Sequence, residues 1–168
     1  GIVREDAIIH SSVPEEAREF AYDIILVGKP TDRSGFGGAA FASVSLDADV
    51  LEQNTGAVQE PNPFLERHLL VSSYALFDWL AGTGNLEHVS FKDLGAGGVV
   101  CATVEQVAEH GFGAEINLDL VHTSVTNLPP EVIACAETQE RFCWICRSTL
   151  TQHILNHYNV VWDLPHVA

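Results

Sequence analysis

The chain of 168 residues carries 23 acidic and 8 basic side chains, a formal net charge of −15, and 46% of its residues are hydrophobic. This charge balance argues against a surface that binds nucleic acid or an anionic membrane, because phosphate contacts need clustered lysine and arginine, and no apolar run reaches transmembrane length. The length predicts one globular domain, residues 1–168, large enough to bury its own core.

The first predicted element is the apolar run Asp23–Gly28, which is typical of a strand buried on both faces. Lys29–Gly38 follows as a glycine-rich loop with two cations; such a backbone can approach a phosphate closely, although surface loops are often glycine-rich as well. Leu46–Gly56 is acidic and without a period, so we expect a connection. Asn62 then caps a helix with Pro63 at its first position. The predicted buried stripe of this helix, which ends at Gly82, is Leu65, Leu69, Ser72, Leu76 and Leu80.

The centre of the chain combines a strand end, a glycine turn and a helix. Val89–Phe91 is predicted to end a strand, Asp93 stands at its carboxyl edge, and a helix follows Gly95–Gly98 and ends at Gly111. The spacing of Val100, Val104, Val107 and Ala108 predicts the buried face of that helix. One interpretation is that Asp93 caps the helix. The other is a phosphate or metal-phosphate site, in which free backbone N–H groups hold anion oxygens and the carboxylate holds the cation. Neither G-x-G-x-x-G nor G-K-[ST] is present.

Three further elements complete the pattern. Ala114–Leu120 alternates as a half-buried strand, Pro129–Ala136 is a short helix, and Phe142–Cys146 is an apolar strand. Ser148 is predicted to cap a last helix that Pro165 interrupts, with Leu150, Ile154, Tyr158 and Val161 as its buried stripe. Strands that alternate with helices, without a repeat or linker, indicate a single α/β or α+β domain with a mixed sheet and helices packed on it.

One pair of cysteines and one pair of histidines have spacings that are found in metal sites. Cys143 and Cys146 form C-x-x-C, but on a strand positions i and i+3 point to opposite faces, so we interpret the cysteines as buried reduced thiols. His153 and His157 are four residues apart on a predicted helix and could share a metal. Because no third ligand accompanies them, a solvated helix face is the expected arrangement.

The stretch Ala136–Arg141 has no bulky apolar side chain and connects a helix to a buried strand. An ordinary connection of this type would more often contain glycine. The polar side chains could hydrogen-bond a sugar or a phosphate ester, or they could form a charged solvated turn. These residues alone leave both interpretations open.

Five stretches carry a resemblance to a known family: Asp32–Ser43, Val58–Arg67, Lys92–Gly98, Glu137–Arg141 and Trp162–Pro165. In this order they resemble phosphoribosylformylglycinamidine synthase, the ATP-dependent amidotransferase of purine biosynthesis in the aminoimidazole ribonucleotide synthetase superfamily. The Glu-Thr-Gln-Glu-Arg run is the most discriminating, since the glycine motifs recur in related kinases and synthetases. The resembling stretches span nearly the whole chain.

The resemblance implies which residues would act. Gln59 aligns with a substrate-binding glutamine, Glu137, Thr138 and Gln139 with a substrate-binding loop, and Asp93 with a magnesium ligand. The family usually has serine at the position of Thr138, and threonine keeps that hydroxyl while adding a methyl group. The implied cofactors are Mg²⁺ and ATP, and the implied location is the cytoplasm. The family's catalytic histidine lies in another domain, so we expect no catalytic residue in this chain.

The resemblance also implies partners. It matches the C-terminal domain of the first synthetase-like repeat, so we expect a fragment of a longer chain, consistent with its start at Gly1 and its lack of methionine. The expected partners are an N-terminal synthetase domain, a second repeat, and a glutaminase domain or subunit. An uncovered apolar face would also favour a homodimer. The alternatives are another ATP-dependent synthetase or kinase of the superfamily, such as thiamine-phosphate kinase, selenophosphate synthetase or a hydrogenase-maturation protein, or a non-catalytic scaffold domain.

Overall fold

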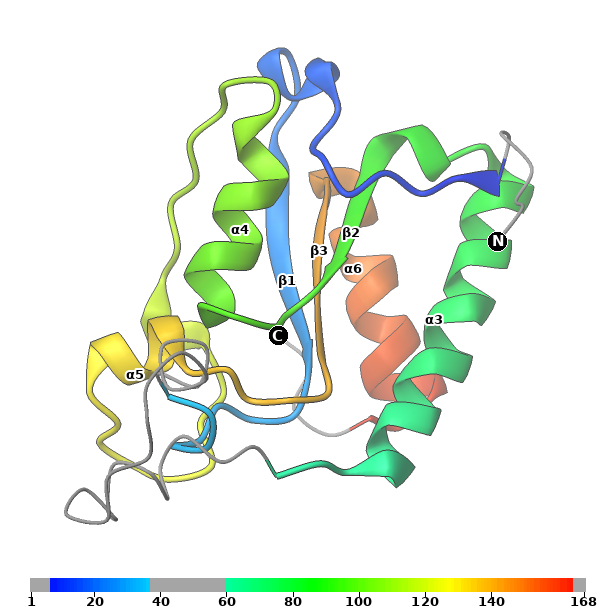
Figure 1. Ribbon diagram of the computed structural model, residues 1–168. Coiled ribbons are helices and arrows are strands. Elements are labelled where there is room, and N and C mark those ends of the chain that lie inside the picture. Colours follow the sequence, from blue (N-terminus) through cyan, green and yellow to red (C-terminus); the bar gives the residue numbers. More distant parts are fainter. Residues whose placement is uncertain (1–6, 37–59, 165–168) are drawn as a thin grey trace, which may run out of the picture.

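The computed structural model describes residues 7–36 and 60–164. Three strands, β1 (Tyr22–Gly28), β2 (Val89–Asp93) and β3 (Arg141–Arg147), form a sheet in the order β1-β3-β2. Helix α4 (Gly98–Ala108) covers one face, and α3 (Pro63–Thr83) and α6 (Ser148–Asn156) cover the other (Figure 1). The smaller elements are α5 (Pro130–Cys135), the 3₁₀ turns Glu15–Arg18, Leu86–His88 and Leu118–Leu120, and the π-helical turn His157–Val161. The predicted α+β class with helices packed on a sheet is confirmed.

Strand β3 lies between β1 and β2 and runs antiparallel to both. Gly28 is opposite Arg141, and Asp93 is opposite Phe142. The ends of β1 and β2 and the beginning of β3 therefore meet at one end of the sheet. The prediction of a mixed sheet is wrong for the described strands, which all pair antiparallel. The parallel pairing in the described part of the chain is a single bridge between Thr31 and Thr123, outside these strands.

The two faces of β3 enter separate cores. Trp144 and Cys146 pack with α3 and α6, whereas Cys143 and Ile145 pack with α4. The two sulfurs of C-x-x-C thus diverge, as predicted. Burial raises the pKa of Cys143 to about 12 and that of Cys146 to about 11, so both thiols stay protonated at neutral pH. All four cysteines are free, but the expectation of burial is wrong for the other two: Cys101 is half-buried and Cys135 is exposed.

Helix α3 begins as predicted. The Asn62 side chain accepts a hydrogen bond from the Leu65 amide (3.0 Å), and Pro63 occupies the first turn, where it needs no N–H. The helix ends at Thr83, and its cap is Gly84 instead of the predicted Gly82. The left-handed backbone of Gly84 lets the Asn85 amide bond the Leu80 carbonyl (2.8 Å). Most of the predicted stripe is buried: Leu69, Ser72, Leu76 and Leu80.

The predicted buried face of α4 is correct at Val107 and wrong at Val100, Val104 and Ala108. Val100 and Val104 are 38% and 54% exposed, and the helix buries polar side chains instead. Buried Thr103 donates to the Val99 carbonyl (2.8 Å), and buried Gln106 donates to the Ser90 hydroxyl of β2 (2.9 Å). These bonds offset the cost of burying polar groups, so the apolar pattern alone misplaces the helix.

The predicted strand Ala114–Leu120 is absent from the described sheet. The Asn117 side chain accepts from the Asp119 amide (3.0 Å), and Leu118–Leu120 forms a 3₁₀ turn. A side chain that bonds the backbone two residues ahead offers an alternative to ladder pairing, and here that alternative wins over the alternating pattern.

The last helix also departs from its prediction at both ends. Ser148 is its first residue and not its cap, and its side chain makes no capping bond. Leu150, Ile154 and Tyr158 are buried, but Val161 is 72% exposed because the π-helical turn rotates it away from the core. Pro165 lies outside the described residues.

Replacing Gly28 with alanine is expected to lower the free energy of unfolding by about 2–4 kcal/mol. Gly28 has φ +121°, and an added Cβ would lie 2.1 Å from the Glu140 carbonyl oxygen. Urea denaturation measures the loss. Gly82→Ala is the matched control, since Gly82 lies in α3 with open space around it, and alanine there should stabilise by up to about 1 kcal/mol. Equal effects of the two substitutions would contradict the close approach.

Candidate functional site

Four segments meet at the end of the sheet where β1 and β2 stop. They are the loop after β1, the residues before α3, the turn between β2 and α4, and the connection from α5 into β3 (Figure 1). The contacts described below involve Lys29–Phe36, Glu60–Asn62, Asp93–Gly98 and Ala136–Glu140. We call this region the polar end of the sheet.

Buried Arg141 holds two segments of the polar end together through hydrogen bonds. Its side chain is 2% exposed and donates to the carbonyls of Thr138 (3.0 Å) and Ala136 (2.6 Å) and to the Thr31 hydroxyl (2.8 Å). Burial lowers the pKa of Arg141 to about 10, so it remains charged at neutral pH. One planar cation thereby fixes the shape of the 136–138 backbone and joins it to the loop after β1.

The hydroxyl of Thr138 is fully buried and joins its loop to the loop after β1. It donates to Asp32 Oδ1 (3.0 Å) and accepts from the Asp32 amide (3.2 Å). Asp32 Oδ1 also accepts from the amide and hydroxyl of Ser34 (2.9 and 2.5 Å), and Asp32 Oδ2 pairs with Lys29 Nζ (3.2 Å). Since its hydrogen is engaged by Asp32, the Thr138 hydroxyl can offer a ligand only its remaining lone pair.

Glu137 joins the same connection to the glycine turn after β2. It is 5% exposed, and its Oε1 accepts from the Gly97 amide (3.4 Å). A Cβ on Gly98 would lie 2.6 Å from the Ala136 carbonyl, so glycine permits the two backbones to approach. Gln139 is half-buried and donates to the Glu137 carbonyl (3.1 Å). The turn and the substrate loop that the resemblance implies are thus in direct contact.

Asp93 is the exposed last residue of β2. It does not cap α4: the N-cap is Gly97, and no side chain makes the capping bond. This finding removes the first of the two interpretations drawn from the sequence. An exposed carboxylate beside a glycine turn suits Mg²⁺, which proteins usually bind through one or two carboxylates together with waters and substrate phosphates. Residues 7–36 and 60–164 contain no group of three or more His, Cys, Asp or Glu that could cage an ion.

The structure therefore brings together most of the residues singled out from the sequence. Asp93, Glu137, Thr138 and Gln139 all lie at the polar end, whereas Gln59 lies outside the described residues. Sequence reasoning missed Asp32 and Arg141. The spacing Asp32-x-Ser34 is a weak signal for the first, because aspartate commonly bonds the amide two residues ahead. For Arg141, the signal is that a cation stands at the start of a buried strand.

The substitution Asp32→Asn is expected to make the free energy of unfolding depend less on pH in the acid range. Burial alone would raise the pKa of Asp32, but hydrogen bonds from Ser34 and Thr138 and the charge of Lys29 hold it below its usual value. A carboxyl with a lowered folded pKa stabilises above its unfolded pKa of about 3.9, and this stability disappears as pH falls through the folded value. By urea denaturation, the loss of stability between pH 7 and pH 3 should be larger in the wild type than in Asp32→Asn, by up to about 1–2 kcal/mol. Parallel pH profiles would contradict this account.

The predicted histidine pair is not a metal site among the described residues. His157 bonds the Ser72 carbonyl (2.8 Å), and His153 stacks on Trp79 with ring centroids 3.6 Å apart. The interpretation as a solvated face holds for exposed His153 only, because His157 is half-buried and its pKa is lowered by that burial.

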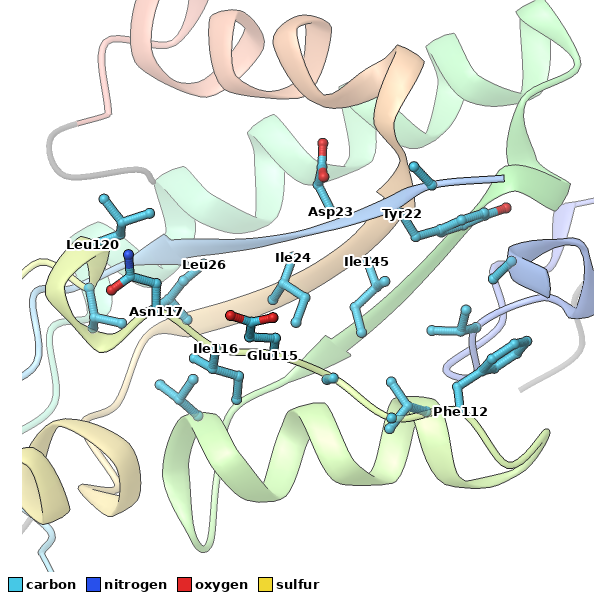
Figure 2. Close-up of a pocket in the computed structure, with 18 of the residues that line it drawn as sticks. Tyr22, Asp23, Ile24, Leu26, Phe112, Glu115, Ile116, Asn117, Leu120 and Ile145 are labelled. Carbon is cyan, nitrogen blue, oxygen red and sulfur yellow. The ribbon is translucent and has the colours of Figure 1, made fainter. Parts of the chain in front are cut away.

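A pocket of about 1140 Å³ lies between β1, α4 and the segment after α4, and its lining reaches Thr123, which pairs with Thr31 of the polar end. Figure 2 shows Ile24, Leu26 and Ile145 pointing from the sheet toward Ile116, while Asp23 points the other way. Asp23 accepts from the Thr151 hydroxyl (2.6 Å) on that far side. This pocket is lined mainly by apolar groups, and Asp93 and Glu137–Gln139 are not among its lining residues. Within the described ranges, no helix is both long and apolar enough to cross a membrane.

Comparison with known proteins gives a consistent result. Residues 23–159 match the family described as AIR synthase related protein, C-terminal domain. The chain is 48% identical over 99% of its length to a phosphoribosylformylglycinamidine synthase subunit PurL from Methanothrix thermoacetophila, and 34% identical over 98% to one from Thermococcus kodakarensis. It spans 21% and 22% of those two relatives.

Solved structures show the same likeness. T. maritima PurL complexed with FGAR superimposes with a TM-score of 0.76 and 32% identity, over 94% of this chain and 24% of that one. T. maritima PurL complexed with ATP gives a TM-score of 0.69 and 27% identity, over 95% of this chain and 22% of that one. The fold and the family match together show that this chain belongs to the family of AIR synthase related proteins, as a C-terminal domain.

Proposed function

We propose that this chain is the C-terminal domain of the first synthetase-like repeat in an ATP-dependent enzyme that converts formylglycinamide ribonucleotide to formylglycinamidine ribonucleotide in purine biosynthesis, in the cytoplasm. One observation carries the proposal: Asp93, the glycine turn that follows it and the loop Glu137–Gln139 all lie at one end of the sheet, where the turn contacts Glu137 and Ala136. The similarity to PurL subunits supports the same assignment.

The proposed reaction activates an amide oxygen. The formylglycinamide carbonyl oxygen takes the γ-phosphoryl group of ATP, ADP leaves, and ammonia then displaces phosphate from the iminophosphate. Magnesium would neutralise charge on the phosphate oxygens, and Asp93 is the residue here that would hold it. Glu137, Thr138, Gln139 and, from the resemblance, Gln59 would bind the substrate. The backbone N–H groups of the glycine turn offer donors to an anion.

This domain would supply part of an active site. The proposal assigns nucleotide contacts and the catalytic histidine to an N-terminal synthetase domain, and ammonia to a glutaminase domain or subunit. T. maritima PurLQS, with a TM-score of 0.72 and 25% identity, supports a partnership of this kind. The isolated chain should then be inactive.

The test compares the isolated chain with the full-length polypeptide. With formylglycinamide ribonucleotide, ATP, Mg²⁺ and ammonia, the full-length protein should release ADP and phosphate, and the isolated chain should not. Turnover by the isolated chain would contradict the shared site. Full-length protein without Mg²⁺-dependent binding would favour a scaffold, and turnover of thiamine phosphate or selenide in place of the formylglycinamide substrate would favour another enzyme of the superfamily.

A further inference from the structure

Glu140 has a backbone conformation that side chains rarely adopt. Its φ is +54°, in the left-handed region, which costs about 1–3 kcal/mol outside glycine. Its carbonyl oxygen accepts a hydrogen bond from the Lys29 amide (3.0 Å). The same oxygen lies so close to Gly28 that a Cβ on that residue would clash with it. The strained residue therefore joins the substrate loop to the loop that follows β1.

The side chain of Glu140 makes a third connection. Its Oε1 accepts from the backbone amide of Asn62 (2.8 Å), the residue that caps α3. Glu140 thus contacts both the loop after β1 and the amino end of α3 from the entry loop of β3. Two of these segments carry the candidate site, and the third sets where a 21-residue helix begins.

The bond to Asn62 is accompanied by costs that a carboxylate at this position brings. Glu140 Oε2 is enclosed and has no hydrogen-bond partner among the described residues. Burial of Glu66 raises the pKa of its carboxyl group, and the nearby charge of Glu140 raises that pKa further. A buried acceptor that lacks a partner, a neighbouring like charge and a left-handed backbone each destabilise the fold. Such costs concentrate where a geometry serves a site.

We propose that Glu140 is a positioning residue of the candidate site, which holds the loop Glu137–Gln139 at a fixed separation from α3 and so sets substrate affinity. This inference rests on the proposed function. Glu140 acts through its neighbours, so its loss should weaken binding of formylglycinamide ribonucleotide and leave the phosphoryl-transfer step nearly unchanged.

The test uses full-length protein and steady-state kinetics with ammonia as the nitrogen donor. Glu140→Ala should raise the KM for formylglycinamide ribonucleotide about tenfold or more, with kcat within about threefold of wild type. Glu140→Asp keeps the charge but is one methylene shorter, and should raise KM about fivefold, which keeps the test available if the alanine variant fails to fold. Glu140→Gln retains an oxygen for the Asn62 amide and can direct its NH₂ toward Glu66, so KM should return to within about twofold of wild type.

Glu60→Ala is the matched control, because this side chain lies at the same end of the sheet but is 81% exposed and pairs only loosely with Lys29 (3.8 Å). Its KM should be unchanged. The inference is overturned if Glu140→Ala and Glu140→Asp lower thermal stability while KM stays at the wild-type value, or if Glu140→Gln behaves like Glu140→Ala. Wild-type protein that does not turn over this substrate overturns the proposed function and this inference together, whereas a normal wild type with unaffected Glu140 variants overturns the inference alone.

Discussion

Arg141→Met is expected to lower the free energy of unfolding by about 3–5 kcal/mol, because three buried acceptors lose their donor at once. These are the carbonyls of Ala136 and Thr138 and the Thr31 hydroxyl, all bonded by the guanidinium within 3.0 Å. Methionine is similar in length but offers no N–H group. Since the 136–138 backbone is held by this cation, the loop Glu137–Gln139 should also lose its shape. Urea denaturation and titration of the full-length protein with the proposed substrate would measure the two effects.

The matched control for this prediction lies on the same strand. Arg147 ends β3 at the opposite end of the sheet, and its guanidinium lies over the Phe20 ring, 3.5 Å from the centroid. Arg147→Met should cost about 1 kcal/mol or less, the value of a partly exposed cation–π contact. If Arg141→Met lowers the free energy of unfolding by no more than Arg147→Met does, the hydrogen bonds of Arg141 contribute little to stability.

Asp93→Asn should reduce the turnover of full-length protein by about 10²–10³-fold while leaving stability unchanged. The exposed carboxylate makes no capping bond to α4, so the fold does not depend on it. Its expected role is to hold a cation on the phosphate oxygens, and several kcal/mol of charge stabilisation corresponds to a rate factor of this size. ADP release at saturating Mg²⁺ would measure the loss.

Asp78→Asn is the control for that variant, because Asp78 is an exposed acid on α3. It should have wild-type activity. A partial recovery of Asp93→Asn at higher Mg²⁺ is also expected, since the amide oxygen still binds the ion weakly. Wild-type turnover by Asp93→Asn would remove the carboxylate from the mechanism and leave the glycine turn as a structural feature.

The sequence predicts well what local interactions determine. Strands β1 and β3 follow from short apolar runs, and the start of α3 follows from Asn62 and Pro63, because strand burial and helix capping depend on residues close in the chain. The position of Asp93 at a strand end before a glycine turn was predicted for the same reason.

Tertiary contacts account for what the sequence does not show. The polar side of α4 is buried because Gln106 bonds Ser90, a partner that no helical period reveals. Arg141 and Thr31 are 110 positions apart, and Asp32 and Thr138 are 106 apart, so no local pattern could pair them. Conversely, Ala114–Leu120 has a strand pattern, yet Asn117 bonds its own backbone and turns the chain.

The most direct test of the shared site is a crystal structure of the full-length protein with formylglycinamide ribonucleotide and a magnesium complex of a non-hydrolysable ATP analogue. The account predicts the sugar phosphate between the glycine turn after Asp93 and the loop Glu137–Gln139, with Asp93 among the ligands of the ion. Substrate bound in the apolar pocket beside Ile24 and Ile116, with the polar end empty, would contradict it.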